Sequence, residues 1–180
     1  MNYKARALAV LVAATVSSAA LASDGKIDFN GELKAETCKV AVNGASGANG
    51  TTVTLPTIST ASLTTAGQVA GQTGFNIELS DCSAAIKTAA AFFESGGSVD
   101  PASGNLKNVS GSATKVQLQL VDATNGQAIM AGNTAQVTST SRVDVANTSA
   151  ILPYAVQYFA QAATTPGTVV SSVTYSINYQ

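Results

Sequence analysis

The chain has 180 residues, of which 46% are hydrophobic and 11% are charged, and its formal net charge is -1. This composition offers no basic patch for nucleic acid and no strong field that would steer a charged partner. Histidine is absent, so the commonest general base and the commonest metal ligand are both missing. The length corresponds to about one domain.

Residues 1–22 have the three parts of a secretory signal peptide. Lys4 and Arg6 precede a short apolar run over residues 7–16, and Ala20-Leu21-Ala22 forms an A-x-A cleavage site. No apolar run in the chain reaches the roughly 20 residues that a membrane-spanning helix needs. Removal of residues 1–22 leaves seven Lys/Arg against ten Asp/Glu, a net charge of -3. We therefore expect an exported, mildly acidic, soluble domain that does not insert into the membrane.

A one-sided β-strand is predicted over residues 26–34, ahead of the first cysteine. Ile27, Phe29 and Leu33 fall on one face, and the alternate positions are polar or charged. Gly31 falls on the apolar face, where a glycine usually marks the close approach of another backbone. By periodicity alone, this segment could be the first strand of a self-contained sandwich.

Cys38 and Cys82 are the two cysteines of the chain. In an oxidising compartment an even pair is most simply explained as one disulfide. A redox site would favour Cys-x-x-Cys, and a metal site would need more ligands. We predict a structural disulfide.

The rest of the chain shows strand after strand and little helix. Alternating or continuous apolar patterns predict strands at residues 52–55, 75–79, 87–94, 115–122, 134–138, 151–159 and 169–179. Residues 87–94 contain several alanines, but Phe92-Phe93 and the glycines that follow favour a buried strand over a short helix. Asn125-Gly126 predicts a hairpin turn that returns through Ile129. Residues 43–52 and 100–113 are predicted to be loops, and residues 58–74 have no clear pattern.

Short strands at this spacing, with one cross-link and Gly/Pro turns, predict an all-β sandwich of two sheets. Five motifs in chain order then resemble the major pilins of type 1 fimbriae, which belong to the chaperone–usher class. They are Phe29-x-Gly31-x-Leu33 with Cys38 seven residues after the glycine, Phe75-Asn-Ile-Glu-Leu-Ser-Asp-Cys82, Pro153-Tyr-Ala-Val-Gln-Tyr-Phe-Ala160, Thr165-Pro-Gly167 and Val173-Thr-Tyr-Ser-Ile-Asn-Tyr-Gln180. The resemblance covers the chain after residue 22 and is weakest at residues 58–74 and 99–113.

The resemblance implies an incomplete immunoglobulin-like sandwich, completed by a donor strand from another subunit. It divides the chain into a signal peptide (1–22), an N-terminal donor-strand extension (23–36) and a pilin domain (37–180). The donor residues would be Ile27, Phe29, Gly31 and Leu33. The edge of the acceptor groove, which also contacts a chaperone, would be Val173, Tyr175, Ile177, Tyr179 and Gln180.

The implied function is that of a structural subunit that polymerises by donor-strand exchange into a surface fimbria supporting cell adhesion. Its partners would be copies of itself, other pilus subunits, a periplasmic chaperone and an outer-membrane usher, and it would need no cofactor or metal. A minor adaptor subunit of the same pilus is one alternative, and a secreted sandwich that binds a small ligand or sugar is another. We expect no enzyme, because the scattered acids and the absence of histidine leave no nucleophile with a base.

Overall fold

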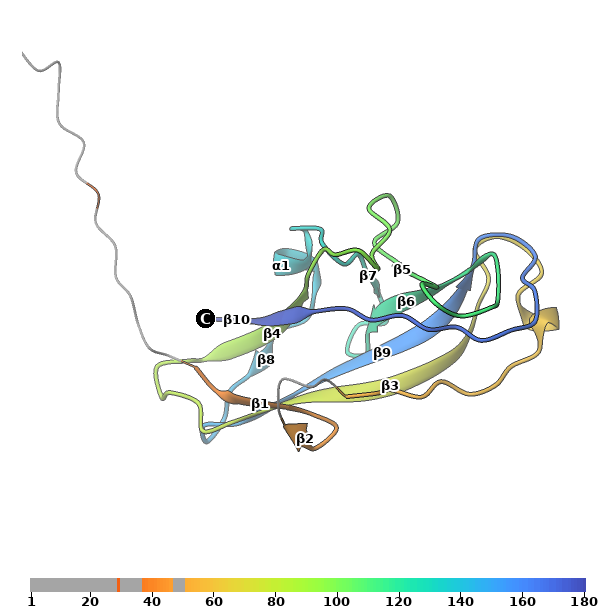
Figure 1. Ribbon diagram of the computed structural model, residues 1–180. Coiled ribbons are helices and arrows are strands. Elements are labelled where there is room, and N and C mark those ends of the chain that lie inside the picture. Colours follow the sequence, from red (N-terminus) through yellow and green to blue (C-terminus); the bar gives the residue numbers. More distant parts are fainter. Residues whose placement is uncertain (1–28, 30–36, 47–50) are drawn as a thin grey trace, which may run out of the picture. The chain divides into compact units, whose positions relative to one another are not determined.

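A computed structural model describes Phe29 and residues 37–46 and 51–180 of the chain (Figure 1). The predicted signal peptide, and the predicted extension apart from Phe29, lie outside these residues. The account below concerns the unit Ala35–Gln180. In the part of the chain that the structure describes, no helix is long and apolar enough to cross a membrane.

Antiparallel strands in two sheets make up most of the regular secondary structure of the described fold. The larger sheet has the order β2-β1-β3-β9-β6-β5, and β7 also pairs with β6. Its strands are β1 (Lys39–Val42), β2 (Ala45–Ser46), β3 (Val69–Ser80), β5 (Leu106–Lys107), β6 (Val116–Asp122), β7 (Ala128–Ile129) and β9 (Ala150–Ala160). The smaller sheet has the order β10-β4-β8 and consists of β4 (Thr88–Phe93), β8 (Val143–Asp144) and β10 (Tyr175–Tyr179).

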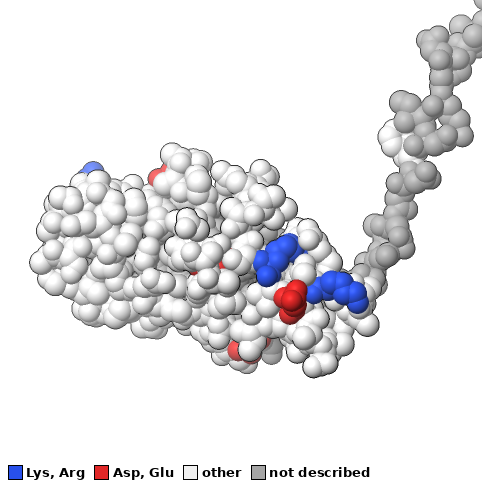
Figure 2. All heavy atoms as spheres, turned by 180° about the vertical axis from the view of Figure 1, so that it is seen from behind, with Lys and Arg blue, Asp and Glu red and all other residues white. Residues whose placement is uncertain are grey.

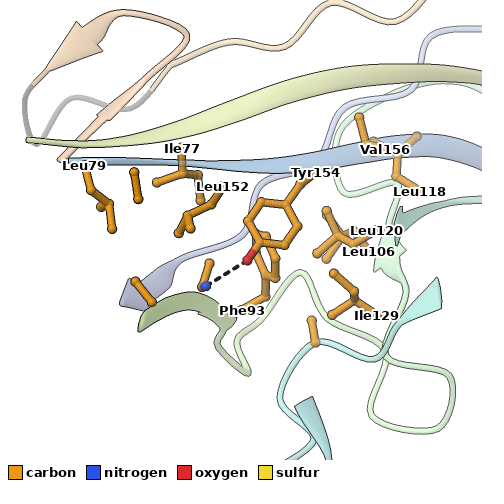
Figure 3. Packing of buried hydrophobic residues seen from close by; sticks show 14 of the residues in the cluster. Ile77, Leu79, Phe93, Leu106, Leu118, Leu120, Ile129, Leu152, Tyr154 and Val156 are labelled. Atoms are coloured by element: carbon orange, nitrogen blue, oxygen red, sulfur yellow. Dashed lines mark hydrogen bonds between the residues drawn. The ribbon is translucent and has the colours of Figure 1, made fainter. Parts of the chain in front are cut away.

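The core lies between the two sheets, as the alternation in the sequence requires. Ile77 on β3, Leu152 on β9 and Phe93 on β4 are almost completely buried (Figure 3). Tyr154 packs edge-to-face on Phe93 with ring centroids 5.1 Å apart, and its hydroxyl accepts a hydrogen bond from the Ala91 amide at 2.8 Å. Burial raises the pKa of the Tyr154 phenol above its ordinary value, so the group stays neutral at physiological pH.

Four strand predictions and the hairpin are confirmed. Residues 75–79 lie within β3, 87–94 contain β4 and not a helix, 115–122 contain β6, and 151–159 lie within β9. At the hairpin, Gly126 has a positive φ of 74° and its amide donates to the Asp122 carbonyl, while Ile129 pairs with Leu120. The two-sheet, all-β architecture is therefore as predicted.

Two predicted strands are wrong. Residues 52–55 form no strand, because no neighbouring strand in the described structure pairs with them, although Val53 and Leu55 pack half-buried against the core. At residues 134–138 the chain forms instead the short helix α1 (Gln136–Ser139). The side chain of Gln136 is drawn inward to the backbone of Phe93, and that contact outweighs the local preference for an extended chain.

The C-terminal strand and the two predicted loops differ in part from the prediction. The C-terminal strand is confined to Tyr175–Tyr179, because the Val170 amide and carbonyl bond to the loop at Asn108 and Val109 and not to a strand. The two predicted loops contain the short strands β2 and β5. Residues 58–74, which had no assignment, contain the 3-10 turn η1 (Thr60–Ser62) and the beginning of β3, with a bulge between Ala70 and Thr73.

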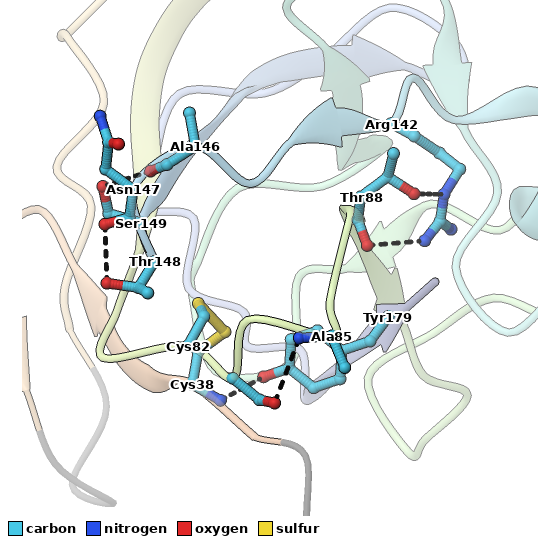
Figure 4. The surroundings of a disulfide bond; sticks show 11 residues. Cys38, Cys82, Ala85, Thr88, Arg142, Ala146, Asn147, Thr148, Ser149 and Tyr179 are labelled. Atoms are coloured by element: carbon cyan, nitrogen blue, oxygen red, sulfur yellow. Dashed lines mark hydrogen bonds between the residues drawn. A yellow bond between two sulfur atoms is a disulfide. The ribbon is translucent and has the colours of Figure 1, made fainter.

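The predicted disulfide is confirmed. Cys38 and Cys82 are bonded at an S–S distance of 2.01 Å across a separation of 44 residues (Figure 4). Cys38 precedes β1 and Cys82 follows β3, and the register of these strands places Lys39 opposite Ser80. The antiparallel pairing therefore brings the two cysteines together at the end of both strands.

Among the described residues, one exposed ion pair contributes little to this fold. The ion pair between Lys39 Nζ and Asp81 Oδ2, at 2.7 Å, is largely exposed, and exposed pairs add little stability. The hydrogen bond to Asp81 raises the pKa of Lys39. The face seen in Figure 2 carries few charged side chains, most of them toward one end. Contacts with other proteins over most of this face must rely on apolar burial and neutral hydrogen bonds.

Candidate functional site

An open groove of about 620 Å³ runs between the N-terminal and C-terminal parts of the described fold. β1 and residues 51–55 form one wall, and residues 171–175, which lead into β10, form the other. The floor is made of core side chains from both sheets: Phe75, Phe93, Leu106, Leu118, Leu120 and Val156. The groove thus lies over core side chains, of which Phe75 remains only partly buried.

The walls of the groove show the same incomplete burial. Val40, Val42, Val53, Leu55 and Val173 all pack against the core but are only partly buried. Removal of apolar surface from water stabilises a fold by roughly 25 cal/mol per Å². An apolar segment that filled the groove would therefore gain this stabilisation from both walls and the floor.

β10 presents a free backbone edge to this side of the fold. It pairs with β4 alone, and the amide of Gln180 and the carbonyl of Thr174 form bonds on the β4 side. Because antiparallel strands alternate the direction of their hydrogen-bonding groups, the backbone groups of Tyr175, Ile177 and Tyr179 point away from β4. Among the described residues they have no strand to pair with, and such an edge is a template for another strand.

Contacts at the C-terminal end of β10 hold it in position. The Gln180 carbonyl accepts from the amides of Lys87 at 2.6 Å and Thr88 at 2.8 Å. The Tyr179 hydroxyl accepts from the Cys38 amide at 3.3 Å, which links the strand to the disulfide (Figure 4). The C-terminal end of β10 is therefore held in place by contacts within the single chain.

Arg142 joins β10 to β4. Its guanidinium donates to the side chain and carbonyl of Thr88 at 2.9 and 3.2 Å, and to the side chain and carbonyl of Asn178 at 2.8 and 3.0 Å. Burial lowers the pKa of Arg142, but an arginine remains charged at any physiological pH. These bonds fix the lateral position of the C-terminal strand.

Replacement of Arg142 by Met is expected to reduce the free energy of unfolding by about 1–3 kcal/mol, because the Asn178 and Thr88 acceptors lose a charged donor. Urea unfolding of the folded subunit would measure this. Lys107→Met is the matched control, since Lys107 is exposed and its side chain makes no hydrogen bond within the described structure. Equal stabilities of the two variants would contradict the role given to Arg142.

The structure places the predicted groove residues at different points along one edge. Val173 and Tyr175 line the groove, whereas Ile177 and Tyr179 lie farther along β10 and pack half-buried against the core. Gln180 is exposed and contributes its backbone. Of the predicted donor residues, Phe29 is 88% exposed, and Ile27, Gly31 and Leu33 lie outside the described residues.

Sequence reasoning missed the opposite wall. Val40 and Val42 belong to β1, and Val53 and Leu55 show the same spacing of two residues. This alternation was a signal for one-sided burial, but it covers too few residues to indicate a groove. Arg142 carried no signal, because its partners are more than 30 residues away.

Comparisons with known proteins agree with this geometry. The family model described as "FimA: Type-1 fimbrial protein, A" matches residues 55–180. The chain is 40% identical over 175 residues to the F17 fimbrial protein of Escherichia coli, covering 94% of this chain and 95% of that protein. The chain belongs to the type-1 fimbrial protein family.

Two further relatives support the assignment of the chain to this family. The major fimbrial subunit SMF-1 of Stenotrophomonas maltophilia is 43% identical over 167 residues, covering 89% of this chain and 95% of that protein. The type-1 fimbrial protein A chain of Escherichia coli K12 is 33% identical over 190 aligned positions, covering both chains completely. The protein is thus a structural subunit of a fimbria and not an enzyme.

The fold agrees with a solved pilin. The crystal structure of the P pilus rod subunit PapA superposes with a TM-score of 0.59, covering 79% of this chain and 99% of that chain. The sequence identity of this pair is 16%, so the likeness concerns the fold alone. It supports the pilin architecture predicted from the sequence.

Proposed function

We propose that this fimbrial subunit polymerises by donor-strand exchange, in which residues 23–36 of each copy fill the groove of the preceding copy. The observation that carries the proposal is the apolar groove beside the free edge of β10. Strand addition to such an edge combines backbone hydrogen bonds with pockets for alternate side chains. The polymer would form a pilus rod at the cell surface that supports adhesion.

The predicted donor segment suits the groove in chemistry. Ile27, Phe29 and Leu33 share one face of an extended segment, so they would point together at the apolar floor. The polar face of the segment would remain toward solvent.

Assembly of such a subunit requires protection of the groove during export. The proposed signal peptide, residues 1–22, directs the chain to the periplasm, where a chaperone covers the groove through contacts along residues 173–180. An outer-membrane usher then exchanges the chaperone for the extension of the next subunit. The name of one relative, the major fimbrial subunit SMF-1, favours a rod-forming role over a minor adaptor role.

Electron microscopy of surface filaments tests the proposal. Cells that export the wild-type chain with its chaperone and usher should form filaments, and a variant with serine at Ile27, Phe29 and Leu33 should form none, because the donor strand loses its apolar anchors. If the triple-serine variant formed as many filaments as the wild-type chain, the proposal of donor-strand exchange would be overturned. Serine at the polar-face residues Asp28 and Glu32 is the control and should leave filaments in place.

Gly31→Val is expected to slow or block assembly while the chaperone-bound monomer stays folded. An inward-facing glycine fits a donor backbone that lies close to the groove floor, and overpacking there costs roughly 1–3 kcal/mol. The measurement is SDS-resistant ladder formation, with circular dichroism of the chaperone complex as the test of folding.

Asn30→Val is the matched control for Gly31→Val, since it adds a β-branched side chain on the opposite face. It should assemble normally. Phe29→Ala should give weaker junctions and not blocked ones, because it removes burial without adding volume. If Gly31→Val unfolded the chaperone-bound monomer, the strand would belong to its own domain.

A further inference from the structure

We infer that Tyr154 and Gln136, together with the backbone of Gly132, close the part of the second edge of β4 that β8 leaves uncovered, so that an incoming strand pairs with β10 and not with β4. The inference rests on the proposed donor-strand exchange and adds a specificity device to it. Its basis is the hydrogen bonding of β4, a strand whose two edges receive different partners.

The edge of β4 toward β10 is paired by strand backbone. The Thr88 carbonyl accepts from the Gln180 amide at 2.9 Å, and the Glu94 amide donates to the Thr174 carbonyl at 2.9 Å. Since hydrogen-bonding groups alternate along an antiparallel strand, residues 88, 90, 92 and 94 serve this edge. The groups of residues 87, 89, 91 and 93 point to the other edge.

Strand β8 covers only the beginning of that other edge. It pairs with Thr88 and Ala89, and the Val145 amide donates to the Lys87 carbonyl at 2.8 Å. The ladder ends there, so Ala91 and Phe93 extend beyond it. Without other partners, the backbone groups of these two residues would form a second template for an extended apolar segment.

Tyr154 closes the edge at Ala91. Its side chain crosses the core from β9 in the larger sheet and accepts the Ala91 amide proton at 2.8 Å (Figure 3). Only 3% of the residue is exposed, so the bond is sheltered from water. Edge-to-face packing on Phe93 keeps the Tyr154 ring in this position.

Gln136 closes the edge at Phe93 together with the backbone of Gly132, whose amide donates to the Phe93 carbonyl at 2.8 Å. Its side-chain oxygen accepts from the Phe93 amide at 3.0 Å, and its side-chain nitrogen donates to the Phe93 carbonyl at 2.9 Å. This is the pair of bonds that a residue of a neighbouring strand would make. The same nitrogen donates to the Asn133 carbonyl at 3.1 Å. Only 3% of Gln136 is exposed, so its side chain is buried.

The consequence concerns the fidelity of assembly. An edge capped by side chains cannot pair with an incoming extension, whereas the edge of β10 keeps its groups directed outward. The smaller sheet would therefore accept no second donor strand at β4, which removes one route to a branched polymer.

The test uses the chain from Ser23 with a second copy of residues 23–35 fused after Gln180, so that the β10 edge is filled within the molecule. Amide hydrogen exchange is followed at Ala91 and Phe93, and native mass spectrometry counts added synthetic peptide of residues 23–35. The variants are Tyr154→Phe, which removes only a hydroxyl, and Gln136→Leu. Their controls are Tyr158→Phe and Gln127→Leu, the latter at an exposed position.

Tyr154→Phe should accelerate exchange at Ala91 by about tenfold and leave Phe93 unchanged, since loss of one buried hydrogen bond favours local opening by about that factor. Gln136→Leu should accelerate Phe93 by a similar factor and bind an additional peptide or a second chain. Gln136→Glu keeps the acceptor for the Phe93 amide and should restore its slow exchange. The parent and both controls should bind no additional peptide.

Unchanged exchange at both amides in the two variants, or binding of additional peptide by the parent, would overturn the inference. If Gln136→Leu does not fold, the Tyr154→Phe result decides, because that variant keeps the aromatic packing. Failure of the proposed function is seen separately, as a fused parent that is no more stable than the chain without the fusion.

Discussion

A copy of residues 23–35 fused after Gln180 through a short turn is expected to convert the isolated chain from an aggregation-prone species into a stable monomer. A strand that follows β10 through a turn runs antiparallel to it, so the fused copy can pair with the free edge and cover the groove. Burial of Ile27, Phe29 and Leu33 stabilises by about 1.5–3 kcal/mol each, an upper bound of roughly 5–9 kcal/mol in total.

Thermal unfolding with and without the fusion measures this gain. For a chain of this size each kcal/mol raises Tm by about 2–4 °C, so we expect an increase in Tm of up to roughly 10–36 °C. The control carries serine at the three apolar positions of the added copy only, and it should gain nothing. A chain without the fusion that is already a stable monomer, with no increase in Tm, would contradict the missing strand.

Cys82→Ser is expected to reduce the free energy of unfolding by about 2–5 kcal/mol, the usual cost of losing a native disulfide in a small exported domain. The bond closes a separation of 44 residues and therefore restricts the unfolded chain. It also fixes Cys38, whose amide bonds to Tyr179 on the acceptor strand, so the pool of subunits available for assembly should fall as well.

Denaturant unfolding of the chaperone-free, donor-complemented chain measures this loss. The double variant Cys38→Ser/Cys82→Ser should cost about as much as either single variant, because either one removes the same bond. Mass measurement after alkylation under non-reducing conditions should find no free thiol in the wild-type protein. Two alkylatable thiols in the native protein would be incompatible with the bond.

Local signals in the sequence were sufficient for much of the fold. The alternation of Val116, Leu118 and Leu120 predicts β6 because one face of that strand is buried along its length. Asn125-Gly126 predicts the hairpin because the turn needs a positive φ, which glycine adopts at little cost. The two cysteines predict their own bond, since export leaves an even pair with one simple use.

Other features depend on contacts that no local pattern records. Residues 52–55 have the composition of a strand, but a strand exists only where a neighbour supplies the ladder. Residues 169–174 belong to the predicted C-terminal strand, yet the backbone of Val170 forms its hydrogen bonds with the loop at Asn108 and Val109 and not with a strand. Gln136 lies in a segment that resembles a strand, and its buried bonds to Phe93 make a helical turn the better solution.

The sequence by itself determined the composition of the core, the disulfide and the one-sided apolar segment near the N-terminus, because each follows from residues that are close together or from the compartment. Only the tertiary structure decided that the core stays open beside β10, that Arg142 holds this strand, and that side chains close the far edge of β4. These are properties of edges, and an edge is defined by which strand is absent beside it. The periodicity of apolar residues indicates that a side chain faces a core, but it does not indicate whether the same chain or another molecule packs against it.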